Sequence, residues 1–207
     1  MANDTKTYTK EQIRKAFEQV QGHVLHMHAY WNLFRKLYRG NAESQPVLAA
    51  VAGQVFAVLG RLLHRGVFFQ FRQLLDPPRS VGRRNASLLG LLEAVAGPGY
   101  RADHGDLVAL IESAEGKKTI REHVNKYIAH LDLDLLAGVA EPPAAVEILE
   151  VEAAFQSIRT FMNEYGIRFV HEPAMAYDEI AEIISEQAES LVATLRAGLD
   201  ASTGTPL

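Results

Sequence analysis

The residues whose types and spacing could support chemistry lie between positions 123 and 132. His123, Lys126 and His130 are separated by three and four residues, so a regular helix with 100° per residue would place them on one polar face. A histidine has an unperturbed pKa of about 6.5 and can take or give a proton near neutral pH. Asp132 and Asp134 follow His130, and a carboxylate can hold the tautomer of an imidazole. The set predicts acid–base chemistry next to a cationic side chain, although a histidine at a helix C-terminus also suits the helix dipole.

Long amphipathic helices must position these residues. Apolar side chains alternate at spacings of four and three from Ile13 to Tyr38, from Leu48 to Leu62 and from Ile148 to Tyr165, and a final amphipathic segment runs from Tyr177 to about Arg196. No segment has the sustained alternation of a strand. The pattern predicts an all-α fold, an antiparallel helical bundle of about five to seven helices. We expect a single domain over residues 1–200 and a disordered tail over 201–207, and the first stripe needs a partner, either the second helix or another subunit.

Capping and breaking residues predict where these helices begin and end. Thr9 with Gln12 three residues later resembles a capping box, and Gly40-Asn41 is expected to end the first helix. Asp76-Pro77-Pro78 is expected to end the second helix, before a basic loop over residues 79–84. Asn85 is predicted to be the N-cap of a short leucine-rich helix, and Asp106 to begin the next helix.

The composition restricts the function classes. The chain has 207 residues and no cysteine, which excludes disulfides, thiol catalysis and cysteine-ligated zinc. The first ten residues are polar and lack the apolar core of a signal peptide, and the apolar run Val47–Leu63 is interrupted by glycine, glutamine and arginine. We therefore expect a cytoplasmic protein with no membrane span. Residues 1–140 carry 18 Lys/Arg and 13 Asp/Glu, whereas residues 141–190 carry 2 and 11, which indicates either an acidic solvated face or a mildly basic surface able to meet phosphates.

Three segments resemble the abortive-infection U-like branch of the HEPN superfamily. They are Phe69-Gln70-Phe71-Arg72-Gln73-Leu74-Leu75-Asp76, Arg83-Arg84-Asn85-Ala86-Ser87-Leu88-Leu89 and Asn125-Lys126-Tyr127-Ile128-Ala129-His130-Leu131-Asp132. The resemblance implies a helical bundle and, in the catalytic members, metal-independent RNA cleavage through the 2′-hydroxyl that leaves a cyclic phosphate. It also implies a composite site built by two protomers, hence a homodimer.

The resemblance assigns roles to individual residues. The catalytic signature is an arginine, four to six residues, then a histidine; His130 matches the histidine and Asn125 the polar residue after the arginine, but Val124 stands where the arginine would align. We expect His130 to be the acid–base residue, with His123 and Lys126 in place of the arginine and with Asn125 and Asp132 in support. The residues expected to contact RNA are Arg65, Arg72, Arg83, Arg84 and Arg121; the last lies about 180° from His130 on a regular helix and would be a poor substitute for the missing arginine.

Two other interpretations stay open. The missing arginine is also compatible with a catalytically inactive HEPN-like module that binds RNA, a nucleotide or a protein, and the long stripes with a structural helical adaptor. His23, His26 and His28 have no acidic residue at a helical spacing that would complete a metal site, so packing or a subunit contact explains them better and we expect neither metal nor cofactor. The expected partners are RNA, a second copy of the chain, and an antitoxin or another protein encoded in the same operon.

Overall fold

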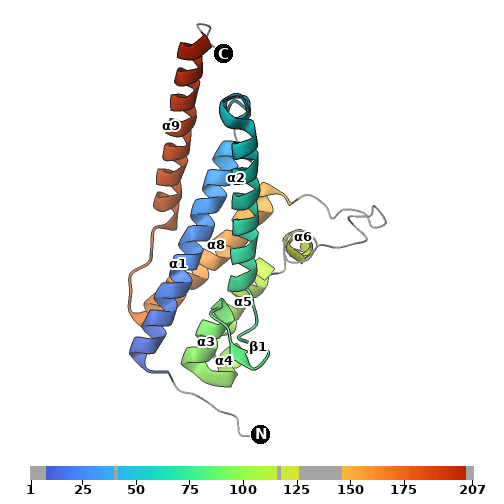
Figure 1. Cartoon of the computed structure of the whole chain (residues 1–207). Helices are drawn as coiled ribbons and strands as arrows, with labels where there is room; N and C mark the ends of the chain where they lie inside the picture. The colour runs from blue at the N-terminus through green and yellow to red at the C-terminus, as the bar shows by residue number, and fades with distance from the viewer. Residues whose placement is uncertain (1–7, 40–41, 116–117, 126–145, 204–207) are drawn as a thin grey trace, which may run out of the picture. The chain divides into compact units, whose positions relative to one another are not determined.

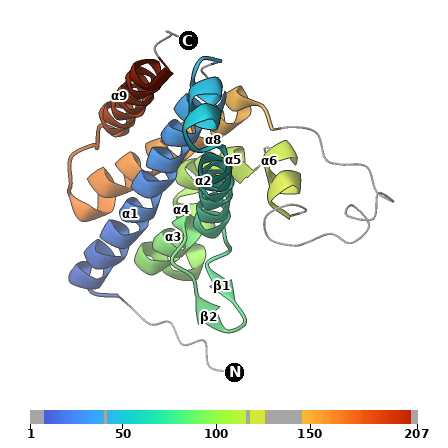
Figure 2. The same cartoon turned by 45° about the horizontal axis from the view of Figure 1, so that its top comes forward.

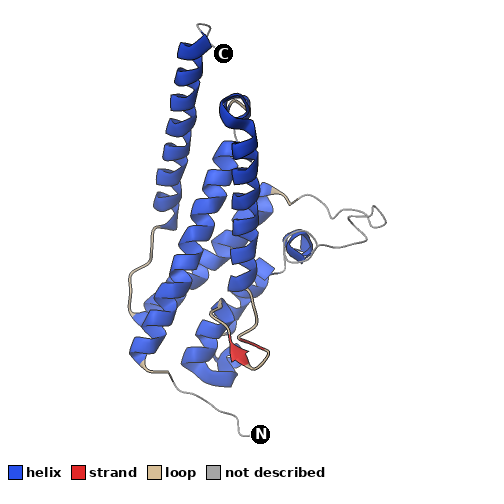
Figure 3. Ribbon diagram, in the orientation of Figure 1, coloured by secondary structure: helices blue, strands red, loops and turns tan. Residues whose placement is uncertain are grey.

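The computed structural model describes residues 8–39, 42–115, 118–125 and 146–203 (Figure 1). Within these ranges every element is helical except for one two-stranded hairpin, so the predicted all-α fold is confirmed (Figure 3). The chain divides into two compact units. Unit 1 comprises Met1–Val24 and Phe69–Met175, and unit 2 comprises Leu25–Phe68 and Ala176–Leu207. The single domain over residues 1–200 stays a prediction, and each unit is described by itself.

Unit 1 is built from short helices around two longer ones. It holds the first part of α1 (Lys10–Phe34), the end of α2 (Ser44–Leu74), β1 (Arg79–Ser80), β2 (Arg83–Arg84), α3 (Leu88–Ala96), η2 (Gly97–Gly99), α4 (Tyr100–Asp103), α5 (Gly105–Glu115), α6 (Lys118–His123), α8 (Ile148–Tyr165) and η4 (Gly166–Val170). Helix α5 packs against α8. The apolar stripe of α8 lies in the core, where Phe155, Ile158 and Tyr165 are at most 1% exposed. The heptad spacing therefore predicted the buried face of α8 correctly.

The helix caps of unit 1 confirm one prediction and overturn another. The amide of Thr9 donates to Oε1 of Gln12 at 3.0 Å, and the amide of Gln12 donates to Oγ1 of Thr9 at 3.2 Å, which completes the predicted capping box. The prediction of Asn85 as an N-cap is wrong. Ser87 caps α3 instead, because its Oγ accepts a hydrogen bond from the amide of Gly90 at 3.1 Å.

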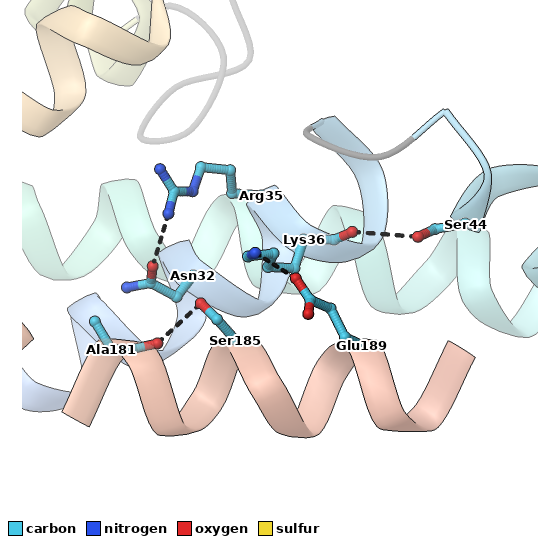
Figure 4. Close-up of polar contacts among 7 residues, drawn as sticks. All are labelled: Asn32, Arg35, Lys36, Ser44, Ala181, Ser185 and Glu189. Atoms are coloured by element: carbon cyan, nitrogen blue, oxygen red, sulfur yellow. Dashed lines mark hydrogen bonds and ion pairs between the residues drawn. The ribbon is translucent and has the colours of Figure 1, made fainter. Parts of the chain in front are cut away.

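Unit 2 contains the second part of α1, η1 (Arg35–Arg39), the first part of α2 and α9 (Tyr177–Thr203). Its core cluster consists of the buried residues Leu37, Val47, Leu48, Ala188 and Val192. Figure 4 shows polar contacts around this core: Glu189 of α9 pairs with Lys36 of η1, and the hydroxyl of Ser44 donates to the carbonyl of Lys36 at 3.4 Å. Leu199 also packs against the core, which explains why α9 continues past the predicted end near Arg196 and into the predicted tail.

The apolar stripes of α1 and α2 differ in burial. Phe17, Val24 and Met27 of α1 are at most 2% exposed, as the heptad spacing predicted. The stripe of α2 is buried at Leu48 and exposed at Val51, Val55, Val58 and Leu62, on both sides of a kink at Ala52, where φ is −160° and ψ is 62°. The stripe of α1 therefore lies in the core of the chain, while most of the stripe of α2 is exposed.

Helix α2 is also the longest helix of the described residues. By length and composition alone it could cross a membrane, which differs from our expectation that the run Val47–Leu63 is too short and too interrupted. The run belongs to a helix of 31 residues, and only 17% of its most apolar 18-residue window is buried. One such helix is weak evidence for a membrane span, because core helices of soluble proteins pass the same test.

Candidate functional site

The C-terminal end of α6 carries the described part of the predicted catalytic cluster. Ile120 and Val124 are 1% and 2% exposed, so both side chains lie in the core. His123 is half-buried and Asn125 is exposed. The Nε2 atom of His123 is shielded from solvent. A direct contact of this atom with a phosphate would therefore require the side chain to move.

The remaining members of the cluster cannot be placed. Lys126, His130 and Asp132 lie outside the described residues. The prediction that they share one face with His123 assumed a regular helix. The backbone is already π-helical at Val124 and Asn125, so the assumption of a regular α-helix fails within the described residues. The shared polar face therefore stays a prediction.

The arginines expected to contact RNA are spread over both units. Arg65 is exposed in unit 2. In unit 1, Arg72 pairs with Asp76 at 3.6 Å, and Arg83 is exposed on β2. The backbone of Arg121 lies in α6, and its side chain is outside the described residues.

The segment predicted to be a basic loop is a β-hairpin, which the sequence pattern did not indicate (Figure 2). Arg79 pairs with Arg84 across its two strands, and the central residues Val81 and Gly82 both have positive φ angles, 47° and 76°. Two positive φ angles are the requirement of a type I′ turn, which usually carries Asn-Gly instead of Val-Gly. The sequence signal for this turn was therefore weak: Gly82 lies in the middle of a basic hexapeptide, but valine and not asparagine precedes it.

Hydrogen bonds stabilise the base of the hairpin and connect it to α3. The side-chain amide of Asn85 donates to the carbonyl of Pro77 at 2.7 Å and accepts from the hydroxyl of Ser80 at 3.0 Å. Nε of Arg79 donates to Oε1 of Glu93 in α3 at 2.7 Å. Asn85, predicted as a helix cap, therefore stabilises the hairpin.

A cavity of about 210 Å³ lies in unit 1 where α1, the hairpin and α3 meet. Ile13, Val20 and Leu91 contribute apolar walls, and Glu93 and Arg84 contribute charges. The guanidinium carbon of Arg84 lies 5.0 Å from the centroid of the Tyr8 ring, which also lines the cavity. The cavity thus combines an apolar interior with an arginine–tyrosine pair, and the spacing of these residues in the sequence gave no sign of it.

The histidines of α1 do not converge in the described structure. His28 is 2% exposed, and its ring lies 5.7 Å from the ring of Tyr177. His23 and His26 are exposed, and the ring of His26 stacks on Tyr30 at 6.2 Å. Within the described ranges no three His, Asp or Glu side chains come together as metal ligands would. Ring contacts account for His26 and His28, in line with the packing interpretation.

Comparison with protein families identifies a match over most of the chain. The family model named AbiU2, of the HEPN type, matches residues 10–186. This range covers most of the chain and includes α6, the hairpin and the segment that contains His130. No curated protein and no solved structure matches the chain.

Proposed function

Because the chain belongs to the AbiU2 family of HEPN domains, we propose that it is a metal-independent endoribonuclease of a prokaryotic defence or toxin–antitoxin system. The family match over residues 10–186 is the single observation that carries this proposal. The proposal includes a cytoplasmic location, a homodimer and an operon-encoded protein partner of the antitoxin type.

The proposed reaction needs one base, one acid and a cation, and no metal ion. His130 takes the proton from the RNA 2′-hydroxyl, whose oxygen then attacks the adjacent phosphorus. The protonated His130 then gives this proton to the 5′-oxygen as that oxygen leaves, and the other product ends in a 2′,3′-cyclic phosphate. Lys126, with support from Asn125, stabilises the charge that develops on the phosphate oxygens, and Asp132 holds the tautomer of the His130 imidazole. A lysine acts there as a point charge and lacks the bidentate geometry of an arginine, so we expect slow cleavage.

The hairpin of unit 1 supports RNA as the substrate class. Arg83 is exposed on it, and Arg84 lies beside a cavity with an aromatic wall. Arginines neutralise backbone phosphates without reading sequence, and single-stranded bases stack on aromatic or guanidinium planes. We therefore expect binding to single-stranded RNA with weak sequence preference and strong salt dependence.

The burial of Val124 favours a second candidate function, a catalytically inactive RNA-binding module. At 2% exposure, this position faces the core, where an arginine could not reach a substrate. The half-buried His123 does not offer an open replacement. The two candidates share RNA binding and differ in whether the RNA is cut.

The experiment that separates them incubates purified protein with a pool of RNA in EDTA and identifies the new RNA ends. The ribonuclease predicts 2′,3′-cyclic phosphate ends that the His130→Ala protein does not generate. RNA that is retained by the protein but stays intact would support the inactive module. Neither binding nor cleavage by a folded protein would contradict both.

A further inference from the structure

The cavity between α1, the hairpin and α3 in unit 1 has the size of one aromatic ring. Its volume is about 210 Å³, whereas a cavity of about 150 Å³ can hold benzene and pockets for drug-sized molecules begin at about 300 Å³. Gln12 and Ala86 line the cavity and are exposed, so the cavity reaches the surface. It can therefore take one ring from outside while the rest of a larger molecule stays at the surface.

Most of the cavity wall is apolar. Ile13, Ala16 and Val20 line it from α1, and Leu91 and Ala94 line it from α3. The faces of an aromatic ring lose little hydration when they enter such a wall, whereas a charged group would lose its hydration shell. The wall therefore favours a neutral, flat ring.

One carboxylate interrupts this apolar wall. The side chain of Glu93 lines the cavity and is only 9% exposed. Nε and Nη2 of Arg79 contact its Oε1 atom at 2.7 and 2.5 Å. Within the described part of the chain both contacts use this one oxygen, so Oε2 can accept a hydrogen bond from a ligand. The cavity therefore offers a fixed acceptor to a ring that carries an N–H group.

The arginines of the hairpin determine what else the ligand carries. Arg84 lines the cavity, and its guanidinium carbon lies 5.0 Å from the centroid of the Tyr8 ring. Arg83 is exposed beside it on β2. With Arg79 these are three arginines near one glutamate, so a lysine or arginine of a protein partner would be repelled. A phosphate attached to the ring would be attracted.

The base of the hairpin fixes the shape of the cavity. The side-chain amide of Asn85 donates to the carbonyl of Pro77 at 2.7 Å. A Cβ on Gly90 would lie 2.2 Å from the backbone oxygen of Asn85, so the hairpin and α3 are in close contact. A cavity that is formed in advance binds its ligand with a smaller entropic loss, because few side chains have to be ordered.

From these features we propose that the cavity binds a single nucleobase with an exocyclic amino group, whose attached phosphate lies against Arg83 or Arg84. The amino group of cytosine or adenine donates to Oε2 of Glu93, as glutamate accepts from the N4 amino group of cytosine in nucleic-acid complexes. Uracil has a carbonyl oxygen at that position, and two acceptors would then face each other. The cavity therefore distinguishes cytosine from uracil, two rings of the same size.

This inference rests on the proposed function, in which the base belongs to a single-stranded RNA, and it adds a preference at one position of the strand. Bases of single strands are commonly recognised at their Watson–Crick edges. A free nucleotide carries the same chemical groups as a nucleotide of the strand. The first test therefore compares both sources of the base.

The first test measures binding of the full-length protein to 2′-O-methyl oligonucleotides, which cannot be cleaved through the 2′-hydroxyl. We expect oligocytidine to bind about tenfold more tightly than oligouridine of the same length, the effect of one hydrogen bond to a charged group. Equal affinities for the two oligonucleotides would overturn the inference and leave the proposed function intact.

Isothermal titration calorimetry with cytidine and uridine monophosphate tests the free nucleotides. Preference for cytidine monophosphate by a protein that binds neither oligonucleotide would assign the cavity to free nucleotides and contradict RNA as the ligand. Absence of binding to all four probes by a folded protein would overturn both the inference and RNA binding.

The second test identifies the acceptor. We expect Glu93→Gln to reduce the ratio of the affinities for oligocytidine and oligouridine to about one, because an amide can present either a donor or an acceptor. Arg79→Gln is the matched control, since it removes the same ion pair but keeps the carboxylate, so the ratio should persist even where both affinities fall. An unchanged ratio in Glu93→Gln, or an equal loss in both variants, would overturn the inference.

The third test fills the cavity. Ala94 is half-buried in its wall, so we expect Ala94→Leu to abolish the cytosine preference without a loss of melting temperature. Ala193→Leu, at an exposed position of α9, is the matched control and should keep the preference. A folded Ala94→Leu protein with the cytosine preference of the wild type would show that the base binds elsewhere.

Discussion

The hydroxyl of Tyr165 donates a hydrogen bond to the backbone carbonyl of Leu91 at 3.1 Å, across 74 positions of sequence. Tyr165 is fully buried near the end of α8, and Leu91 lies in α3. The ring of Tyr165 stacks on Phe17 at 5.7 Å and on Phe161 at 5.9 Å. One side chain therefore joins α1, α3 and α8, the helices that support the hairpin and its cavity.

We predict that Tyr165→Phe lowers the free energy of unfolding by about 1 kcal/mol, the usual net contribution of a buried hydrogen bond. The ring contacts remain, so the helical content of the folded protein should not change. Urea unfolding followed by circular dichroism measures the effect. An unchanged midpoint would mean that this hydrogen bond does not stabilise unit 1.

The same substitution has a pH signature. Burial raises the pKa of Tyr165 well above the ordinary value of about 10. The folded state holds the Tyr165 hydroxyl proton more tightly than the unfolded state does. The contribution of this hydroxyl to the free energy of unfolding is therefore present below pH 10 and is lost as the pH rises through the folded pKa. We therefore expect the wild type to lose stability above pH 10 faster than Tyr165→Phe. Parallel losses in the two proteins would contradict the assignment.

The hairpin turn offers a stabilising substitution. Val81 is a β-branched residue with a φ of 47° and a fully exposed side chain, which is an unfavourable backbone conformation for valine. Asparagine tolerates this region and precedes glycine in favoured type I′ turns. We predict that Val81→Asn raises the free energy of unfolding by about 0.5–1 kcal/mol. A fall in the melting temperature would show that Val81 makes a stabilising contact that offsets its strain.

The approach of the hairpin to α3 makes Gly90 irreplaceable. A Cβ at this position would lie 2.2 Å from the carbonyl oxygen of Asn85, a backbone atom that cannot move away without opening the base of the hairpin. We predict that Gly90→Ala destabilises the protein by several kcal/mol, on the order of 2–4. Gly22→Ala is the matched control, because a Cβ on Gly22 of α1 meets nothing within 4 Å and alanine favours helices. Equal melting temperatures for the two variants would contradict the prediction.

An ion pair joins the start of α5 to η4. Nη1 of Arg168 lies 2.6 Å from Oδ2 of Asp106, and this hydrogen bond to the guanidinium lowers the pKa of Asp106. The folded pKa of Asp106 lies below the unfolded value of about 3.9. The contribution of the ion pair to the free energy of unfolding is therefore present above that pH and is lost as the pH falls through the folded pKa. Both side chains are largely exposed, so we expect a small and salt-sensitive effect.

The test compares melting temperatures of the wild type and Asp106→Asn at pH 7 and at pH 3. The variant should be less stable at pH 7. The difference in melting temperature should become smaller at pH 3 and in 1 M salt, where the Debye length is about three times shorter than at physiological salt. Asp76→Asn is the control, since Asp76 pairs with Arg72 at the longer distance of 3.6 Å. A gap that does not change with pH would mean that the charge of Asp106 is not involved.

We do not expect Val124→Arg, which introduces the arginine of the family signature, to restore a catalytic site. Val124 is 2% exposed, so Val124→Arg would place a charge in the core at a cost of several kcal/mol. We predict lower stability and no gain in RNA cleavage. Differential scanning fluorimetry and a cleavage assay check this together. A stable Val124→Arg protein with faster cleavage would show that position 124 faces the catalytic site after all.

The sequence predicted the helices well because apolar residues at helical spacing mark the face of a helix that packs against a partner. Phe17, Val24 and Phe155 lie where the heptad spacing placed them, and the capping box of Thr9 and Gln12 depends only on local geometry. The hairpin was missed because Val81 is an unusual turn residue. The exposure of Val55 was not predictable, since an apolar stripe has the same spacing whether its partner lies in the chain or outside it.

The candidate site was less predictable than the fold. Position 124 was interpreted from an alignment with a signature, and the change of helix geometry at that residue depends on packing that a spacing rule does not contain. The cavity beside Arg84 is formed by residues from α1, the hairpin and α3, and no local motif brings these together.

The central claim is tested most directly by the rate at which the protein cleaves a defined single-stranded RNA in EDTA. We predict measurable cleavage by the wild type, a loss of about 10²–10⁴-fold in His130→Ala, and no loss in His23→Ala, whose histidine is exposed on α1. Equal rates in all three proteins, or no cleavage by a folded wild type, would contradict the assignment of a ribonuclease site to His130.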